Sequence, residues 1–220
     1  MNPPSVFARQ LISWFITLII PFLLIMSAVR ILLSPPFLEF EYRTPNFPPD
    51  TYGFTLSDRL EWATYAIDYL VNNAGINYLG DLHFADGKPL YNERELSHMA
   101  DVKNLVQGML KVWIIGLAIL LLLGIWAWRS FWLVDFRAGL RRGGWATIGL
   151  IVVVLIAVVI NFNTLFTDFH LLFFTGSSWI FLYTDTLIRL FPIRFWQDCF
   201  IAMGILSMAG GLILGLGLKK

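Results

Sequence analysis

Four long apolar segments, separated by stretches that hold most of the polar residues, dominate the pattern of this chain. They cover approximately residues 11–33, 112–128, 145–166 and 200–218. A helix needs about 20 residues to cross the hydrocarbon core of a bilayer, and the aromatic and basic residues beside the second segment lengthen it into the headgroup layer. The pattern therefore predicts an all-α membrane protein with four transmembrane helices.

The stretches between these segments complete the predicted organisation. The first segment lacks a small-x-small cleavage site and is followed by Ser34-Pro35-Pro36, so we expect it to be a retained span rather than a signal peptide. In chain order, the first half is expected to contain the first span (1–33), a small cap with the stem of the second span (34–107) and the second span itself (108–130). A basic loop (131–144), the third span (145–166), an interfacial segment (167–197) and the fourth span with a basic end (198–220) should follow.

The cap begins with proline-rich chain and continues into two predicted helices. Its prolines favour an extended path over residues 34–50. Thr55 and Asp58 have the spacing of a capping box, and apolar residues follow them at helical intervals, so a helix should start near Thr55. Asn92-Glu93-Arg94-Glu95 has an N-cap residue with Glu three residues later, which predicts the start of another helix, over about 93–128. This helix would be roughly 50 Å long, which exceeds the roughly 30 Å hydrocarbon core. Its first turns should therefore stand outside the membrane.

Composition supports the membrane interpretation and excludes some functions. The chain is 57% hydrophobic with a mean hydropathy of +0.68, too apolar for a soluble domain of 220 residues. Its net charge of +1 gives no reason to expect a nucleic-acid partner. Cys199 is the single cysteine, so no disulfide can form within the chain.

The distribution of charge predicts the orientation in the membrane. The 131–144 loop is basic, as is the end of the chain at Lys219-Lys220, whereas 34–107 carries five basic and eleven acidic residues. Basic segments remain on the cytoplasmic side. We therefore expect both termini in the cytoplasm, with the cap and the 167–197 segment on the extracytoplasmic face. That second segment is too polar to span and too aromatic for a free loop, which favours the interface.

This topology brings two of the three histidines, His98 and His170, to the same membrane face. Arg94, His98 and Asp101 share one face of the stem helix, where Asp101 could orient the imidazole. A structural ion-pair network on the helix surface remains the alternative interpretation. His83 has no such neighbours, and we assign it a structural or solvent-exposed role.

Metal and transport chemistry fit the residues less well. The Glu95-x-x-His98 spacing of di-iron bundles occurs once rather than twice. A zinc site would need His98, His170, Asp101 and Asp168 to converge, so we expect no metal or other cofactor. The spans hold almost no ionisable residues of the kind that line ion paths. The glycine-rich fourth span favours close helix packing instead.

Four sequence blocks carry a resemblance to a known family. They are Phe47-Pro48-Pro49-Asp50-Thr51-Tyr52-Gly53-Phe54, Tyr91-Asn92-Glu93-Arg94-Glu95-Leu96-Ser97-His98-Met99-Ala100-Asp101-Val102-Lys103, Phe169-His170-Leu171-Leu172-Phe173-Phe174, and Asp185-Thr186-Leu187-Ile188-Arg189-Leu190-Phe191-Pro192. In this order between four spans, they resemble the bacterial lipoprotein intramolecular transacylase family and its wider group of four-span membrane proteins.

The resemblance implies an acyltransferase of the bacterial plasma membrane. Such an enzyme moves the sn-2 acyl chain of a diacylglyceryl-modified lipoprotein onto the α-amino group of its N-terminal cysteine, giving a lyso-form lipoprotein. Its partners are membrane lipids and diacylglyceryl-modified lipoproteins. The alternatives are a non-catalytic membrane protein whose cap binds a lipid or partner, or a metal-dependent membrane hydrolase.

The same resemblance implies roles for individual residues. His98 and His170 match the catalytic histidine blocks, and two imidazoles within roughly 4–7 Å could share one reacting group. The supporting residues would be Arg94, Asp101 and Asp168. The substrate-binding residues would be Tyr52, Phe54, Phe173, Phe174, Trp179 and Arg189.

Overall fold

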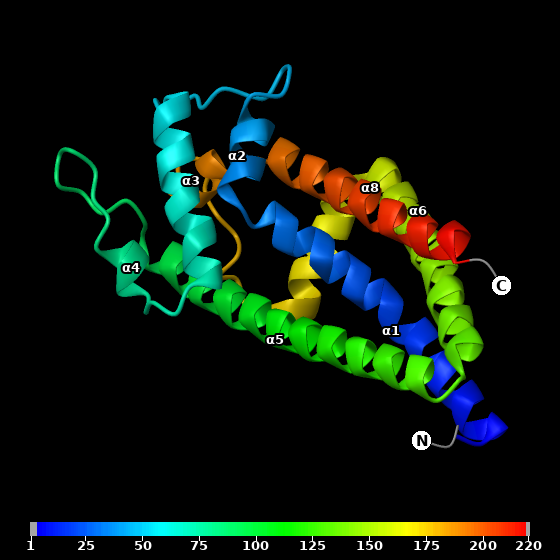
Figure 1. The fold of residues 1–220 in the computed structure, drawn as a ribbon. Coiled ribbons are helices and arrows are strands. Elements are labelled where there is room, and N and C mark those ends of the chain that lie inside the picture. Colours follow the sequence, from blue (N-terminus) through cyan, green and yellow to red (C-terminus); the bar gives the residue numbers. More distant parts are fainter. Residues whose placement is uncertain (1–3, 219–220) are drawn as a thin grey trace. The chain divides into compact units, whose positions relative to one another are not determined.

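The computed structural model describes residues 4–218, which form eight helices (Figure 1). They are α1 (Val6–Leu32), α2 (Pro35–Tyr42), α3 (Leu56–Val71), α4 (Asn77–Gly80), α5 (Glu93–Arg129), α6 (Leu133–Phe173), α7 (Thr186–Leu190) and α8 (Ile193–Gly217). Within residues 4–218, strand-type pairing is limited to an isolated bridge between His83 and Pro89. The four longest helices, α1, α5, α6 and α8, are long and apolar enough to cross a membrane, which confirms the predicted spans.

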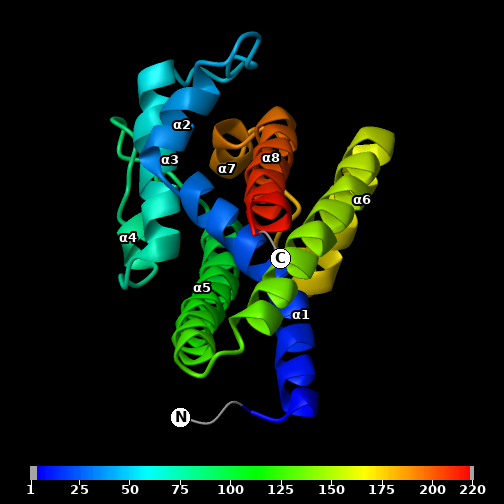
Figure 2. The same cartoon turned by 45° about the vertical axis from the view of Figure 1, so that its right-hand side comes forward.

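The helices are shared between two compact units. The first unit contains the described parts of Met1–Arg30, Met109–Val159 and Ile201–Lys220. The second contains Ile31–Gly108 and Ile160–Phe200, and therefore both candidate histidines. In the second unit, α2 and α3 lie side by side in both views (Figures 1 and 2).

The first unit is organised around α1. Ile16, Ile20 and Leu23 of this helix are buried in a core that they share with Ala127 of α5 and with Trp132. Many other apolar side chains of the unit are exposed, as a helix surrounded by lipid requires. The unit therefore has the pattern of a membrane domain, with a narrow protein core and an apolar surface.

Helix α6 contacts its neighbours through glycines. A β-carbon on Gly139 would lie 2.6 Å from the carbonyl oxygen of Ser13 in α1. A β-carbon on Gly144 would lie 2.5 Å from the carbonyl oxygen of Gly211 in α8. No side chain fits at such distances, so the helix backbones touch directly. At Gly211 this confirms that glycine in the fourth span permits close packing.

This contact can be tested with two alanine variants of the same helix. Gly144→Ala should lower the stability of the protein by about 1–3 kcal/mol, because the new methyl group overlaps the α8 backbone. Gly149→Ala is the matched control, since nothing lies within 4 Å of the place that its new methyl group would occupy. It should melt at the native temperature or slightly above, given the higher helix propensity of alanine. Equal melting temperatures for the two variants in detergent would contradict the packing.

The 131–144 stretch is helical from Leu133, where the sequence predicts a loop. Leu133, Phe136 and Leu140 recur at helical spacing and belong to or pack on the core of the first unit. This spacing indicates a helix, but the prediction of a loop was based on the basic residues of the stretch. Arg142 turns inward, and its Nη2 donates to Ser13 Oγ at 2.8 Å. The basic stretch therefore both forms and anchors the beginning of α6.

Helix α6 bends at Asn161, whose φ of −159° and ψ of 88° are not helical. Asn161 Oδ1 accepts a hydrogen bond from the Thr164 amide at 3.1 Å, as an N-cap does, and the helix then continues to Phe173. The predicted interfacial segment 167–197 thus begins as helix. This second part of α6 carries His170.

The core of the second unit is formed by α2, α3, α7 and the first turns of α5. The predicted Thr55–Asp58 capping box is present at the start of α3, and a reciprocal pair, Asn92 and Glu95, caps α5 in the same way. The prediction of extended chain after Ser34 is wrong, because α2 begins at Pro35. Proline is accepted in the first turn of a helix, where its missing N–H has no intrahelical partner.

Candidate functional site

His98 of α5 and His170 of α6 face each other in the second unit. Their ring centroids are 6.0 Å apart, and their planes are inclined by 23°. Both side chains are buried, with residue exposures of 7% and 8%. The two imidazoles therefore lie within the separation at which they can contact one small reacting group.

Aromatic side chains enclose the pair. Phe174 and Phe181 pack against His98 in T-shaped geometry, with ring centroids 5.1 and 5.3 Å away. Trp179 lies 4.9 Å from the ring of His170. We call these five residues the histidine site. Its walls are apolar, which suits hydrocarbon chains and limits the access of water.

The hydrogen bonds of the two imidazoles differ. His170 Nδ1 lies 2.7 Å from the carbonyl oxygen of Phe166. A carbonyl oxygen only accepts hydrogen bonds, so Nδ1 carries the proton and Nε2 of the neutral ring is left with a lone pair. His98 Nδ1 is buried and has no hydrogen-bond partner among residues 4–218. His170 is thus fixed as one tautomer, and His98 is not.

A buried carboxylate holds the first turn of α5 against α7. Glu95, with 1% exposure, accepts from the Asn92 amide at 2.8 Å and from the Leu187 amide at 2.7 Å. Glu95 lies one turn before His98 on the same helix. The place of Glu95 three residues after Asn92 is a capping signal in the sequence, and the structure confirms it. What the sequence could not show is the second bond of Glu95, to the Leu187 amide 92 residues away.

Asp185 makes a second connection between the same elements. Its carboxylate accepts from Asn92 Nδ2 at 3.1 Å, Arg94 Nη2 at 2.9 Å and the Leu182 amide at 2.8 Å. The ion-pair partner of Arg94 is therefore Asp185, and not His98. Through this connection, the loop that carries Phe181 is held over His98.

The other predicted supporting residues lie apart from the imidazoles. Asp101 and Asp168 are both exposed, and in the described chain neither forms a hydrogen bond or ion pair with His98 or His170. Across residues 4–218, no three His, Cys, Asp or Glu side chains are grouped to hold a metal ion. The support of the histidine site instead comes from Glu95, Asp185 and a backbone carbonyl.

The predicted substrate-binding residues fall into two places. Phe174 and Trp179 belong to the histidine site, and Phe173 packs on Phe169 at 4.9 Å beside it. Tyr52, Phe54 and Arg189 line or border a separate pocket of about 290 Å³ in the same unit. We call this cavity the arginine pocket. Its lining residues are Pro48, Pro49, Asp50, Thr51, Tyr52, Arg59, Tyr183, Ile188, Arg189 and Pro192.

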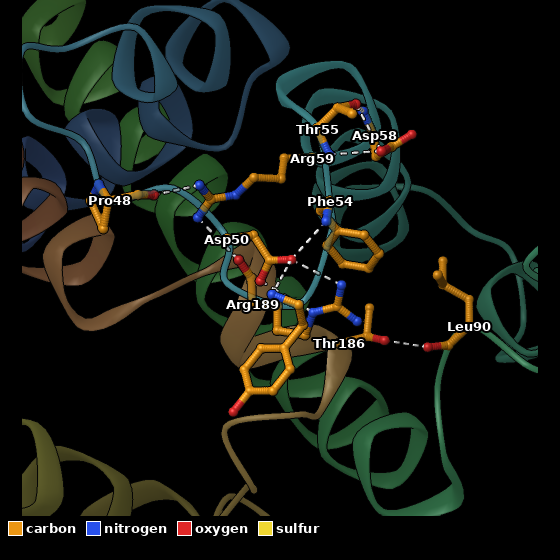
Figure 3. Close-up of polar contacts among 10 residues, drawn as sticks. Pro48, Asp50, Phe54, Thr55, Asp58, Arg59, Leu90, Thr186 and Arg189 are labelled. Atoms are coloured by element: carbon orange, nitrogen blue, oxygen red, sulfur yellow. Dashed lines mark hydrogen bonds and ion pairs between the residues drawn. The ribbon is translucent and has the colours of Figure 1, made fainter.

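A buried ion pair forms one wall of the arginine pocket. Arg189 Nη2 lies 3.0 Å from Asp50 Oδ2, with side-chain exposures of 11% and 3% (Figure 3). The guanidinium also stacks on Phe54, 3.5 Å from the ring centroid. Sequence reasoning proposed Arg189 as a substrate ligand and did not identify its partner, because 139 residues separate the two.

Asp50 should make stability depend on acidic pH. Burial raises the pKa of Asp50, but hydrogen bonds from Arg189 and from the Phe54 and Tyr52 amides outweigh burial and bring the pKa below its usual value. A lowered folded-state pKa stabilises the fold at pH values above the unfolded pKa of about 3.9, and this contribution is lost as the pH falls through the folded value. The melting temperatures of the native protein and Asp50→Asn should therefore differ by a constant amount above about pH 5 and converge below about pH 4. A difference that stays constant down to about pH 2.5 would contradict the ionised pair.

Comparisons with known proteins are consistent with this architecture. The family model described as "Lipoprotein intramolecular transacylase Lit" matches residues 13–196. A protein of Aquifex aeolicus (strain VF5), described as uncharacterized, is 30% identical over 207 residues, which cover 94% of this chain and 92% of that protein.

Two solved structures share the fold. The in meso structure of the membrane integral lipoprotein intramolecular transacylase Lit from Bacillus cereus is 20% identical, with a TM-score of 0.74 over 96% of this chain and 94% of that one. A mutant of that protein is also 20% identical, with a TM-score of 0.69 over 95% and 91%. At this level of identity the likeness concerns the fold.

Proposed function

Because this chain belongs to the lipoprotein intramolecular transacylase family, we propose that it moves the sn-2 acyl chain of a diacylglyceryl-modified lipoprotein to the α-amino group of the same lipoprotein's N-terminal cysteine. The observation that carries the proposal is the pair of buried imidazoles, His98 and His170, 6.0 Å apart in an aromatic enclosure. This is the kind of site that proton transfer between a nucleophile and a leaving group requires.

The reaction balances without another reactant. The amine nitrogen attacks the ester carbonyl carbon and forms an amide bond, and the bond from that carbon to the glyceryl oxygen breaks. One proton leaves the amine, and the glyceryl oxygen gains one to become a hydroxyl. Nucleophile and leaving group belong to the same molecule, so the protein needs no acyl-enzyme intermediate.

The hydrogen bonds favour a division of tasks between the imidazoles. We assign His170 as the base, because its Nδ1–H is held by the Phe166 carbonyl and its Nε2 is free to accept the amine proton. His98 Nδ1 has no hydrogen-bond partner among residues 4–218, so we assign it to donate a hydrogen bond to the oxyanion that develops on the ester carbonyl. His170 then returns the proton to the departing glyceryl oxygen.

The enclosure would contribute by folding the substrate. Attack requires the amine and the ester carbon to approach to about 3–3.5 Å, and an enzyme that holds them there removes much of the entropic barrier. Phe173, Phe174 and Trp179 offer the apolar surface against which acyl chains can be bent back toward the cysteine. The same surface excludes water, which would hydrolyse the ester instead.

We further propose an orientation in the bacterial plasma membrane. The arginines and lysines of 131–144 and 219–220 favour cytoplasmic placement of both termini. The acidic 34–107 segment, with its Thr55-capped helix, would then form an extracytoplasmic cap beside the histidine site. This arrangement would expose the site to lipoproteins that have already been exported and lipidated.

A purified preparation can test the proposed reaction. The full chain in lipid nanodiscs should convert a synthetic diacylglyceryl lipopeptide to its N-acyl, monoacylglyceryl isomer. Substrate and product have the same mass, so the readouts are loss of the free α-amino group to an amine-reactive dye and a tandem mass spectrum that locates the acyl chain. A persistently free amine would refute the proposal and favour a lipid-binding or partner-binding cap.

A further inference from the structure

The arginine pocket carries an excess of positive charge. Its charged lining residues are Asp50, Arg59 and Arg189, and the first and last of these neutralise each other. Arg59 has no carboxylate within ion-pair distance in the described chain, although its residue exposure is only 5%. A buried cation without a counter-ion is costly to maintain. The pocket is therefore suited to an occupant that brings negative charge or hydrogen-bond acceptors.

Arg59 also retains unused donors. Its Nη1 donates to the Pro48 carbonyl at 2.7 Å and its Nη2 to the Arg189 carbonyl at 3.0 Å (Figure 3). The guanidinium has five N–H groups, and its Nε is buried without a partner among residues 4–218. The rings of Tyr42 and Phe47 lie over it at 5.1 and 5.0 Å, which fixes its position. The donors are thus held in place before any ligand binds.

Two tyrosines at the edge of the pocket are exposed. The exposure of Tyr52 is 51%, and that of Tyr183 is 79%. Together with the adjacent prolines and Ile188, these rings offer flat surfaces and hydroxyl groups to a bound chain. Such surfaces are typical of sites that bind extended peptides.

A short piece of chain connects the arginine pocket to the histidine site. Phe181 packs on His98, and Tyr183, two residues later, lines the pocket. Consecutive Cα atoms are about 3.8 Å apart, so those of residues 181 and 183 are at most about 7.6 Å apart. A peptide whose first residue reacts at the histidine site could reach the pocket within its next few residues.

We propose that the arginine pocket binds the peptide part of the lipoprotein substrate, namely the residues that follow the lipid-modified cysteine, and that it favours an acidic residue among them. This inference rests on the proposed function and adds a substrate preference to it. The apolar histidine site would take the acyl chains, while the polar pocket beside it would take the peptide. The N–H groups of Arg59 Nη1 and Nη2 that are not bonded to the Pro48 and Arg189 carbonyls would bind peptide carbonyls or the acidic side chain, whereas the buried Nε would not.

The test compares three lipopeptides that share one diacylglyceryl cysteine and differ at the third residue, which is aspartate, asparagine or lysine. The full chain is held in phosphatidylcholine nanodiscs, and both KM and the dissociation constant of a fluorescent lipopeptide are measured. The aspartate peptide should bind about tenfold more tightly than the lysine peptide, which corresponds to about 1.4 kcal/mol. The binding measurement does not depend on acyl transfer.

Variants of an exposed rim residue test whether the pocket causes this preference. Thr51→Glu should abolish the advantage of the aspartate peptide, because it cancels the excess charge, and Thr51→Lys should increase it. Asn73→Glu, exposed and outside the pocket, is the charge-matched control and should keep the native preference. Tyr183→Ala should raise KM for all three peptides more than it changes kcat.

The outcomes separate this inference from the proposed function. Equal binding of the three peptides would overturn the inference, even if all are converted. Peptide selectivity that Thr51→Glu leaves intact would also overturn it. The binding measurement is repeated in nanodiscs with added phosphatidylglycerol. Binding that changes with the phosphatidylglycerol content, and not with the peptide sequence, would overturn the inference and assign the pocket to a lipid headgroup. If the aspartate peptide binds selectively but no amine is acylated, the proposed reaction fails and the peptide site stands.

Discussion

Replacing His170 with asparagine should reduce the rate of acyl transfer by about 10²–10⁴-fold, the usual contribution of a positioned general base. The asparagine amide can still donate to the Phe166 carbonyl, where Nδ1 of the imidazole does so at 2.7 Å. It has no counterpart of Nε2, the atom that we propose accepts the amine proton. The variant therefore removes the base and preserves its anchoring hydrogen bond.

His98→Asn should cause a loss of similar order, because the oxyanion loses its proposed hydrogen-bond donor. The matched control is His83→Gln, since His83 is exposed and its hydrogen bond is to the nearby Asp81 carbonyl. That variant should retain native activity. Rates are followed through the free α-amino group, with melting temperatures measured for every variant. Native activity in either site variant would contradict the two-histidine mechanism.

Breaking the Asp50–Arg189 ion pair should lower the stability of the protein more than the Gly144→Ala change does. Asp50→Ala leaves the Arg189 guanidinium buried without its counter-ion, and removing one partner of a buried pair costs about 3–5 kcal/mol. Arg189→Ala should be similarly damaging. The double variant should be less destabilised than the sum of the two, because no unpaired charge remains.

An exposed ion pair in the same unit provides the control. Arg43 Nε lies 2.6 Å from Glu39 Oε1, closer than the buried pair, but more than half of each side chain is exposed. Glu39→Ala should therefore change stability by about 0.5 kcal/mol or less. Thermal unfolding of the native protein and these four variants in one detergent shows whether burial or distance determines the contribution of an ion pair. Equal losses of stability for Asp50→Ala and Glu39→Ala would show that burial does not determine how much an ion pair contributes to stability.

The features that follow local rules could be predicted from the sequence. Hydrophobic runs of membrane length gave the four spans. Thr55 with Asp58 marked the beginning of α3, and Asn92 with Glu95 marked that of α5. The order of the spans along the chain predicted one membrane face for His98 and His170, and the structure adds the 6.0 Å separation of their rings.

The features that sequence reasoning missed depend on competing local signals or on distant contacts. The prolines after Ser34 were interpreted as helix breakers, although Pro35 occupies a position where helices accept proline. The bend at Asn161 gave no periodic signal, because a single asparagine caps the second part of α6. Helical spacing also aligned Asp101 with His98, but spacing cannot show that a side chain is exposed.

Long-range pairs were the least predictable part of the site. Asp185 contacts Arg94 across 91 residues, and Arg189 contacts Asp50 across 139. A single sequence contains no register or period that relates such positions. These pairs form only when α7 packs against α3 and the first turn of α5.

The most direct test of the central proposal is an isotope-crossing measurement on the purified protein. Two lipopeptides are mixed in equal amounts, one with a heavy sn-2 acyl chain and a heavy peptide, the other with both light. Transfer within one molecule predicts N-acylated product that is entirely heavy or entirely light, and the His170→Asn variant should form it about 10²–10⁴-fold more slowly. Product that combines a heavy acyl chain with a light peptide, or a free amine that persists with the native protein, would contradict the account.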